Sequence, residues 1–367
     1  MDQAFIDGAP AELAAAAAVA ARLLESSRQP VIAGLGADTA GTRAALRLAG
    51  RLGAAVDHMH GEALLRDLDA MREGGAIVVA PAEARVRADT VLLVGPGVGA
   101  RENPLSRYVL GAVDGGTDRG GTGRRIFWLC PGADPGPAAG VAVIGGGGAG
   151  LPAILAALRA RVGGRPVSEA SVSREVLDGL AAALAAARFG VAMWSAEALD
   201  AMTIAMLCGL IDDLNAATRF SGLAVPPPDN AVGVQTVCGF TTGFPVRTLC
   251  RPQAPEHDPW RFSAARMVES GEADCVLWIS AFRAAAPQWR GAPKALLALA
   301  PPRVAFARPP QVHIAIGAPG RDHDGVVHHA MLGSLAAEPA TAPTAALAVA
   351  AAIEAIEVHL TDGGRRC

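Results

Sequence analysis

The sequence predicts an α/β protein with mostly parallel sheets. The chain has 367 residues, enough for two domains of ordinary size, and its 51% hydrophobic against 18% charged residues exclude a disordered protein. Short apolar or β-branched runs alternate with longer segments rich in alanine and leucine. This alternation is typical of buried parallel strands that are joined by crossover helices.

The first half of the chain shows this alternation most regularly. Gly34 and Gly36 lie where the first buried strand is expected to turn into a helix. The predicted strands are 30–35, 54–57, 90–94, 125–130 and 141–144, and the predicted helices are 11–27, 39–52, 63–72, 104–112 and 151–161.

A second group of elements follows the turn-forming run at 163–166, GGRP, which we predict to be a lobe boundary or a connection. Residues 226–230 contain three consecutive prolines and are predicted to form a sharp loop. The predicted strands of this group are 189–195, 274–279, 304–307 and 313–317, and its predicted helices are 173–187, 197–214 and 341–359.

The charge balance argues against two classes of partner. With 32 basic and 35 acidic residues the net charge is −3, so no global positive field attracts nucleic acid or an anionic membrane. The uncharged stretch 135–158 could span a bilayer, but its glycine run and three prolines would interrupt a membrane helix. Asp2, Asp7 and Glu12 occupy the region where a signal peptide needs basic residues, so we expect a cytoplasmic protein without a membrane span.

The six cysteines form no CxxC pair, which argues against a cysteine-bound zinc or iron–sulfur site. Cys208 and Cys275 lie in apolar segments and are expected to be reduced, buried thiols. Cys130 ends a predicted strand, where an exposed nucleophile is one interpretation, but a lone cysteine beside a proline is more often a packing residue, and we expect packing beside Pro131. No G-x-S-x-G turn supplies a serine nucleophile.

Two glycine-rich turns raise the hypothesis of a nicotinamide site. Residues 95–100, GPGVGA, match G-x-G-x-x-A after a strand, and residues 145–150, GGGGAG, match G-x-G-x-x-G. Neither is followed by a strand that ends in a ribose-binding acid, and the strand after the first turn ends at 130–132, CPG. Ordinary strand-to-helix turns are the alternative.

Histidines raise a second hypothesis, a zinc or iron site. His58 and His60 flank Met59 at a predicted strand end. The other candidate ligands are His323, His328 and His329 with Asp322 and Asp324. The spacing matches no metalloenzyme motif, and solvated loop side chains are the alternative interpretation.

Five strings occur in order along nearly the whole chain. They are PVIAGL at 30–35, LGAAVD at 52–57, RADTVLLVG at 87–95, LNAATRFS at 214–221 and GFTTGFPVRT at 239–248. Together with the strand predicted at 274–279, they resemble the B subunit of formylmethanofuran dehydrogenase, a molybdopterin oxidoreductase. The resemblance implies two Rossmann-like lobes with mostly parallel sheets, one formed by 1–62 with about 226–367 and the other by 63–225, without the iron–sulfur domain.

Three parts of that family's redox site are missing from this sequence. The catalytic relatives carry an N-terminal cysteine cluster for an iron–sulfur cluster, whereas no cysteine precedes Cys130 here. Their metal-binding cysteine lies in a Cys-His-Gly string, and the corresponding stretch is Met59-His60-Gly61, whose thioether is a weak ligand for oxidised molybdenum or tungsten. The acid that binds the guanine of the pterin dinucleotide is replaced by the CPG string at 130–132.

Degenerate B subunits of this kind occur in the formyltransferase/hydrolase complex of methylotrophic bacteria, and the sequence resembles these degenerate forms. The resemblance implies a scaffold without catalytic, cofactor-binding or metal-binding residues, in which Met59, His60 and Gly61 are a vestigial metal site. Its partners would be a formyltransferase subunit, an amidohydrolase-type subunit and a further small subunit. Such a complex moves a formyl group from tetrahydromethanopterin to a methanofuran-type carrier and releases formate.

Two alternative functions stay open. The first is an active molybdenum or tungsten formylmethanofuran dehydrogenase subunit that uses His60 in place of cysteine, and the second is a nicotinamide-dependent oxidoreductase. A scaffold, in contrast, needs exposed apolar or aromatic surfaces that contact partners. The candidate surfaces are the loop at 226–230 and the tryptophan-bearing segment 259–262.

Overall fold

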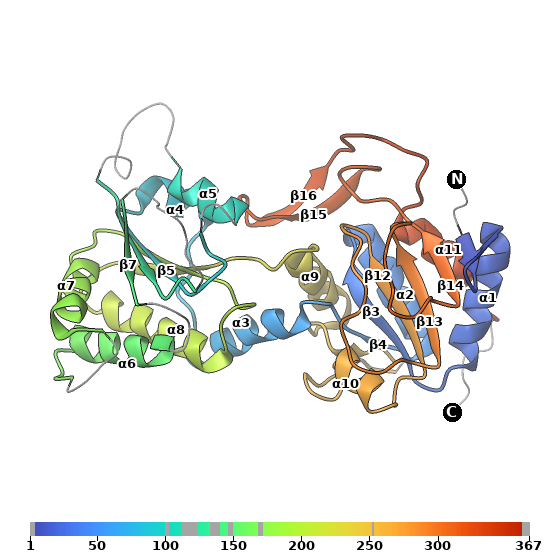
Figure 1. Ribbon diagram of the computed structural model, residues 1–367, viewed down its shortest axis with the longest axis horizontal. Helices are drawn as coiled ribbons and strands as arrows, with labels where there is room; N and C mark the ends of the chain where they lie inside the picture. Colours follow the sequence, from blue (N-terminus) through green and yellow to red (C-terminus); the bar gives the residue numbers. More distant parts are fainter. Residues whose placement is uncertain are drawn as a thin grey trace. The chain divides into compact units, whose positions relative to one another are not determined.

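The computed structural model describes residues 4–99, 103–111, 123–132, 140–145, 150–167, 172–251 and 253–361. The chain divides into two compact units, which are described separately (Figure 1). Unit 1 comprises Met1–Glu62, Pro228–His328 and Leu335–Cys367, and unit 2 comprises Ala63–Pro227 and His329–Ser334. The run at 163–166 lies inside unit 2, where it connects two helices, so it is not a lobe boundary.

Unit 1 is built on a nine-stranded sheet. Its strands are β1 (Ala4–Ile6), β2 (Ala9–Ala11), β3 (Pro30–Gly36), β4 (Ala55–Val56), β10 (Thr248–Leu249), β11 (Glu256–His257), β12 (Cys275–Ser280), β13 (Ala295–Ala300) and β14 (Val312–Ala315). They lie in the order β11-β10-β4-β3-β12-β13-β14-β1-β2. The central strands β4, β3, β12, β13 and β14 are parallel to one another. At one edge β10 is antiparallel to β4 and to β11, and at the other edge β1 is antiparallel to β14 and to β2.

The segments that connect the strands of this sheet cover its two faces differently: loops and one short helix lie on one of them. The helices of unit 1 are α1 (Leu13–Ser26), α2 (Thr39–Leu52), α9 (Ala231–Thr242), α10 (Ala264–Glu269) and α11 (Val349–Glu357). From β3 the chain continues to β4 in one direction, whereas from β12 it continues through β13 to β14 in the other. Because parallel connections are right-handed, the two sets lie on opposite faces. Loops join β12, β13 and β14, so loops and the short helix α10 cover the second face.

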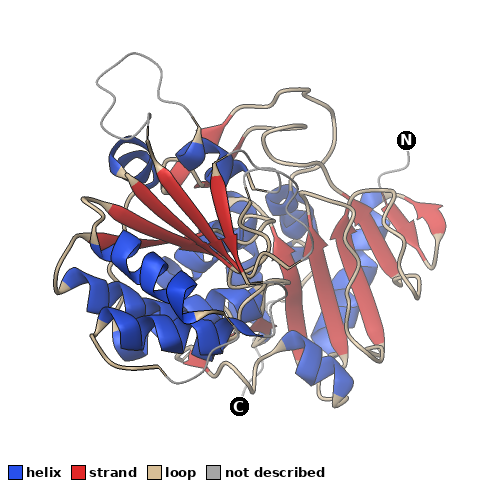
Figure 2. Ribbon diagram, turned by 60° about the vertical axis from the view of Figure 1, so that its left-hand side comes forward, coloured by secondary structure: helices blue, strands red, loops and turns tan. Residues whose placement is uncertain are grey.

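Unit 2 contains a five-stranded, fully parallel sheet in the order β7-β6-β5-β8-β9 (Figure 2). Its strands are β5 (Thr90–Val94), β6 (Arg125–Leu129), β7 (Val141–Ile144), β8 (Gly190–Trp194) and β9 (Phe220–Ala224). The helices that follow α3 (Gly61–Gly74) are α4 (Pro81–Arg87), α5 (Pro104–Leu110), α6 (Leu151–Val162), α7 (Arg174–Ala185) and α8 (Ala201–Asn215). A hydrophobic cluster lies on each face of this sheet, which is why β5 and β8 are buried throughout.

The predicted α/β class with mostly parallel sheets is confirmed, but two predicted elements are wrong. Residues 304–307 are irregular, because they lie between proline pairs that cannot donate to a sheet, and the strand is β13 instead. The helix predicted at 341–359 begins only at Val349. Pro343 disfavours a helix at the residue before it, and the amide of Thr344 donates to the carbonyl oxygen of Asp322 at 3.0 Å.

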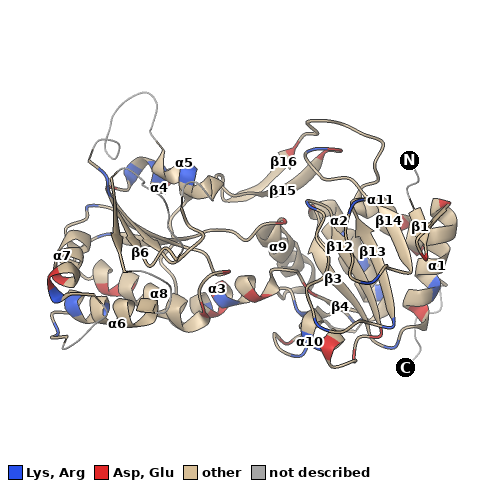
Figure 3. Cartoon of the chain, viewed as in Figure 1, with Lys and Arg blue, Asp and Glu red and all other residues tan. Residues whose placement is uncertain are grey.

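Other elements were not predicted at all. They are β1, β2, α4, β9, α9, β10, β11, α10 and a separate two-stranded sheet of β15 (Gly325–His329) and β16 (Ser334–Glu338). In the part of the chain that the structure describes, no helix is long and apolar enough to cross a membrane. Acidic and basic residues both occur along the ribbons of each unit (Figure 3).

Candidate functional site

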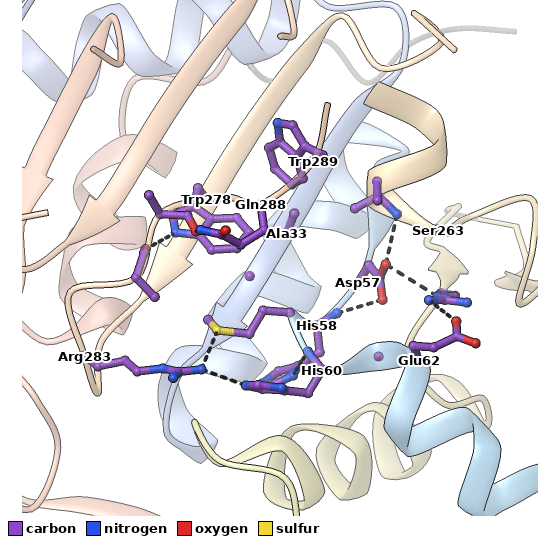
Figure 4. A pocket seen from close by; sticks show the side chains of 18 of the residues that line it. Ala33, Asp57, His58, His60, Glu62, Ser263, Trp278, Arg283, Gln288 and Trp289 are labelled. Atoms are coloured by element: carbon purple, nitrogen blue, oxygen red, sulfur yellow. Dashed lines mark hydrogen bonds and ion pairs between the residues drawn. The ribbon is translucent and has the colours of Figure 1, made fainter. Parts of the chain in front are cut away.

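A cavity of about 790 Å³ lies in unit 1, on the loop-covered face of the nine-stranded sheet (Figure 4). The chain leaves the neighbouring strands β3 and β12 in opposite directions, and open α/β sheets bind ligands in the crevice at such a switch point. The strand ends there are irregular, because the β3–β12 register shifts between Trp278 and Ser280. Gly34 has φ +76°, and a Cβ there would lie 2.6 Å from the carbonyl oxygen of Ile279, so this close approach requires glycine.

His58, the first of the predicted strand-end histidines, is a buried and neutral side chain. Its Nδ1 accepts a hydrogen bond from the backbone amide of His60 at 3.0 Å, so Nε2 carries the proton and faces the carbonyl oxygen of Asp229 at 3.2 Å. Burial lowers the pKa of His58 to about 4. Both ring nitrogens are therefore occupied by backbone groups, and the ring holds the loop in place.

His60 belongs to a compact group of charged side chains at one end of the cavity. Oδ2 of Asp229 lies 3.1 Å from Nε2 of His60 and 2.6 Å from Nη2 of Arg283. The same Nη2 lies 2.9 Å from Nε2 of His60 and 3.9 Å from the sulfur of Met59 (Figure 4). Burial opposes ionisation of Asp229, but its hydrogen bond with His60 and the Arg283 cation lower its pKa overall. One buried carboxylate thus joins the imidazole to the guanidinium.

Asp57 organises the other side of the loop. Its Oδ1 accepts from the amide of His58 and its Oδ2 from the amide of Ala264, both at 2.9 Å, while Nε of Arg247 lies 3.5 Å from Oδ2. Arg247 also donates to Glu62 at 2.9 Å. Burial raises the pKa of Asp57 to about 6, although the Arg247 cation opposes the shift.

This raised pKa predicts a pH dependence of stability. A carboxyl group whose pKa is higher in the folded than in the unfolded chain stabilises the fold below the unfolded value of 3.8, and this contribution is lost as the pH rises through about 6. We expect Asp57→Asn to remove the effect. The unfolding free energy of the wild type minus that of the variant should fall by up to about 3 kcal/mol between pH 4 and pH 7. Urea unfolding at each pH checks this, and a constant difference would contradict it.

The cavity residues do not suit a molybdenum or tungsten centre. The sulfur of Met59, which the resemblance places at the position of the metal-binding cysteine, faces the guanidinium of Arg283, a cation that would repel a metal ion. The two nearby imidazoles are already bonded to protein groups. Among the described residues, no group of three or more His, Cys, Asp or Glu side chains could hold a metal ion.

The other histidine candidates do not join this site. Nδ1 of His323 faces the carbonyl oxygen of Asp324 at 2.8 Å, and Asp322 pairs with Arg321 at 2.7 Å and caps the amide of Ala318. His328 and His329 lie on β15. The contacts of His323 and Asp322 are therefore structural ones within a loop.

Packing explains the first glycine-rich turn. The indole Nε1 of Trp128 donates to the carbonyl oxygen of Gly95 at 2.8 Å, and a Cβ on Gly99 would lie 2.6 Å from the Trp128 ring. The indole therefore fills the space that a pyrophosphate would need at these glycines. Ala100 and residues 146–149 of the second turn lie outside the described residues.

The cysteines of the described chain are all buried and free. Cys130 is fully buried, and burial raises the pKa of its thiol, so it is a packing residue, as expected, and not an exposed nucleophile. The expectation of reduced, buried thiols at Cys208 and Cys275 is confirmed. Cys367 lies outside the described residues.

The two predicted contact surfaces differ in exposure. Trp260, in the segment 259–262, is 71% exposed, and Phe240 at the end of α9 is 78% exposed. In the loop at 226–230, by contrast, Asp229 is buried and pairs with His60, which lines the cavity. That loop therefore supplies a site residue, which the sequence analysis missed together with Arg283.

Fold and site together define a two-unit α/β protein whose strand-end histidine loop is tied to protein groups. No family model matches the sequence. The chain is 33% identical over 369 residues, covering 99% of both proteins, to the B subunit of the formyltransferase/hydrolase complex Fhc of Methylorubrum extorquens. Its structure matches a chain in the crystal structure of the formyltransferase/hydrolase complex FhcABCD from Methylorubrum extorquens in complex with methylofuran. The TM-score is 0.85 and the identity 32%, over 97% of this chain and 98% of the other.

The chain belongs to the family of B subunits of the formyltransferase/hydrolase complex. The resemblance that the sequence strings indicated, to the degenerate form of the B subunit, is thereby confirmed.

Proposed function

We propose that this chain is the non-catalytic scaffold subunit of a formyltransferase/hydrolase complex. The observation that carries the proposal is its 33% identity to the Fhc B subunit over 99% of both chains. The complex moves a formyl group from tetrahydromethanopterin to a methanofuran-type carrier and releases formate. A formyltransferase subunit and an amidohydrolase-type subunit carry the chemistry, and a further small subunit completes the assembly.

The geometry of the histidine loop supports the scaffold role. Both ring nitrogens of His58 are hydrogen-bonded to backbone groups, and the sulfur of Met59 faces the guanidinium of Arg283. These contacts stabilise a loop, whereas a metal ligand needs a donor atom free to bind the ion. The buried, unpaired thiols of the described chain suit a reducing compartment, so a cytoplasmic location is part of the same proposal.

An affinity tag on this chain tests the proposal in its native host. We expect the purified assembly to contain subunits of the formyltransferase and amidohydrolase type. It should transfer a formyl group from tetrahydromethanopterin to the carrier and release formate. Recovery of the tagged chain alone, without either activity, would contradict the proposal.

Exposed aromatic side chains give a prediction about assembly. Phe240 lies in the last turn of α9 and Trp260 follows β11, both in unit 1, and aromatic residues are enriched at interfaces. We expect Phe240→Ser combined with Trp260→Ser to lower the recovery of partner subunits at least about tenfold, as for a central interface contact. Their exposure predicts a change of only about 0.5–1 kcal/mol in the stability of the chain itself.

Val358→Ser is the matched control, because Val358 is another exposed apolar residue of unit 1, 80% exposed beyond the end of α11. It should leave the recovery of partner subunits unchanged. Equal recovery from the double variant and the wild type, measured by quantitative mass spectrometry of the tagged assembly, would exclude both side chains as interface contacts.

A further inference from the structure

The cavity of unit 1 has the size of a ligand site. Its volume of about 790 Å³ lies within the range of roughly 300–1,000 Å³ that is typical of small-molecule and cofactor pockets. It also opens at the switch point between β3 and β12, where open α/β sheets bind ligands. Every residue that lines it belongs to unit 1, so this unit forms the pocket by itself.

One wall of the cavity is a fixed apolar surface. The indole of Trp278 is held by a 2.8 Å hydrogen bond from its Nε1 to the carbonyl oxygen of Ala285. Trp289 meets it edge to face, with ring centroids 5.4 Å apart and an interplanar angle of 87°. Ala284 and Ala286 continue the wall. The wall is preformed, and a flat apolar group can pack on it with little ordering cost.

Arg283 also lines the cavity, and one edge of its guanidinium has hydrogen-bond donors without acceptors among the described residues. The contacts of its guanidinium to Asp229, His60 and Met59 all use Nη2. Within the described chain, Nε and Nη1 have no hydrogen-bond partner, and the side chain is 52% exposed. A guanidinium held in place through one nitrogen presents its other edge in the fork geometry that matches a carboxylate.

The remaining charges limit the ligand to a single negative group. Arg247 is already paired with Glu62 and lies near Asp57, and Asp229 offsets part of the charge of Arg283. A diphosphate would meet these carboxylates with no further cation to balance it. One carboxylate, in contrast, needs only the open edge of Arg283.

We propose that the unit 1 cavity binds an organic carboxylate of up to cofactor size, with its flat apolar body on the Trp278–Trp289 wall and its carboxylate on Arg283. This proposal goes beyond the scaffold role, because it gives the chain a ligand of its own. It holds whether or not the chain assembles with partners.

Calorimetric titration of the full chain with 2-naphthoate tests the proposal, and uncharged 2-naphthamide is the matched probe. We expect saturable binding of one naphthoate per chain and at least about tenfold weaker binding of the amide, as expected for loss of a charge-assisted hydrogen bond. Arg283→Gln should weaken naphthoate binding by a similar factor. Arg303→Gln, an exposed arginine of unit 1 that does not line the cavity, should leave it unchanged.

Because Arg283 also holds Asp229, Trp289→Ala provides a second variant that keeps this ion pair. It should weaken the binding of naphthoate and naphthamide by the same factor, since both probes use the wall. Absence of saturable binding at millimolar naphthoate would overturn the proposal. Equal affinities for acid and amide, or unchanged binding in a folded Arg283→Gln variant, would also overturn it.

Discussion

Replacing Gly61 by alanine is expected to destabilise the chain by about 2–4 kcal/mol. A Cβ at this position would lie 2.3 Å from Oδ1 of Asp57, the atom that accepts the amide of His58. Asp57 is buried and fixed by the amide of Ala264 on its other oxygen, so it cannot move aside without leaving a buried amide unpaired. Urea unfolding, followed by circular dichroism, measures the loss.

The same helix provides the control. Gly74 is the last residue of α3, and a Cβ there would meet nothing within 4 Å. Gly74→Ala should therefore change stability by no more than about 1 kcal/mol, towards stabilisation, because alanine favours the helix. Equal unfolding midpoints for the two variants would show that the Asp57 loop tolerates a side chain at Gly61.

The second large effect is expected in the core of unit 2. A Cβ on Gly190 would lie 2.1 Å from ring carbons of Phe220, its direct partner across β8 and β9, and the Phe220 ring is fully buried. We expect Gly190→Ala to cost about 1–3 kcal/mol by overpacking and Phe220→Ala to cost about 3–5 kcal/mol by leaving a cavity.

A double-mutant cycle measures the interaction free energy between residues 190 and 220. In Gly190→Ala combined with Phe220→Leu, the smaller leucine makes room for the new methyl group. The double variant should then be about 0.5–3 kcal/mol more stable than the sum of the two single changes predicts. Strict additivity of the unfolding free energies would mean that the two residues do not compete for the same space.

The sequence allowed prediction of the elements whose local pattern is strong. The β-branched run of β5 and the glycine-marked turn after β3 were predicted at their correct places. β13 was missed because its alanines and leucines favour a helix as much as a strand, and only its place beside β12 makes it a strand. The hairpin of β15 and β16 depends on similar non-local pairing.

In the site, the loop with Met59 and His60 could be predicted from the sequence, but the residues that contact it could not. The strand-end string with Met59 and His60 was identified from sequence, but Asp229 and Arg283 are 169 and 223 positions away from His60. Arg283 follows the predicted strand at 274–279, so the rule that ligands bind at the carboxyl ends of parallel strands was a signal that could have found it. Asp229 could not be predicted as a site residue, because it lies in a proline-rich segment that we expected to be an exposed loop.

The central claim is that this chain is a redox-inactive scaffold of a formyl-transfer assembly. The most direct test is to purify the assembly through a tag on this chain and to measure molybdenum, tungsten and pterin per copy of the chain. The account predicts that none of the three is present stoichiometrically, while formyl transfer and formate release proceed. Stoichiometric molybdenum or tungsten with a pterin, retained by this chain after the partners are removed, would contradict it.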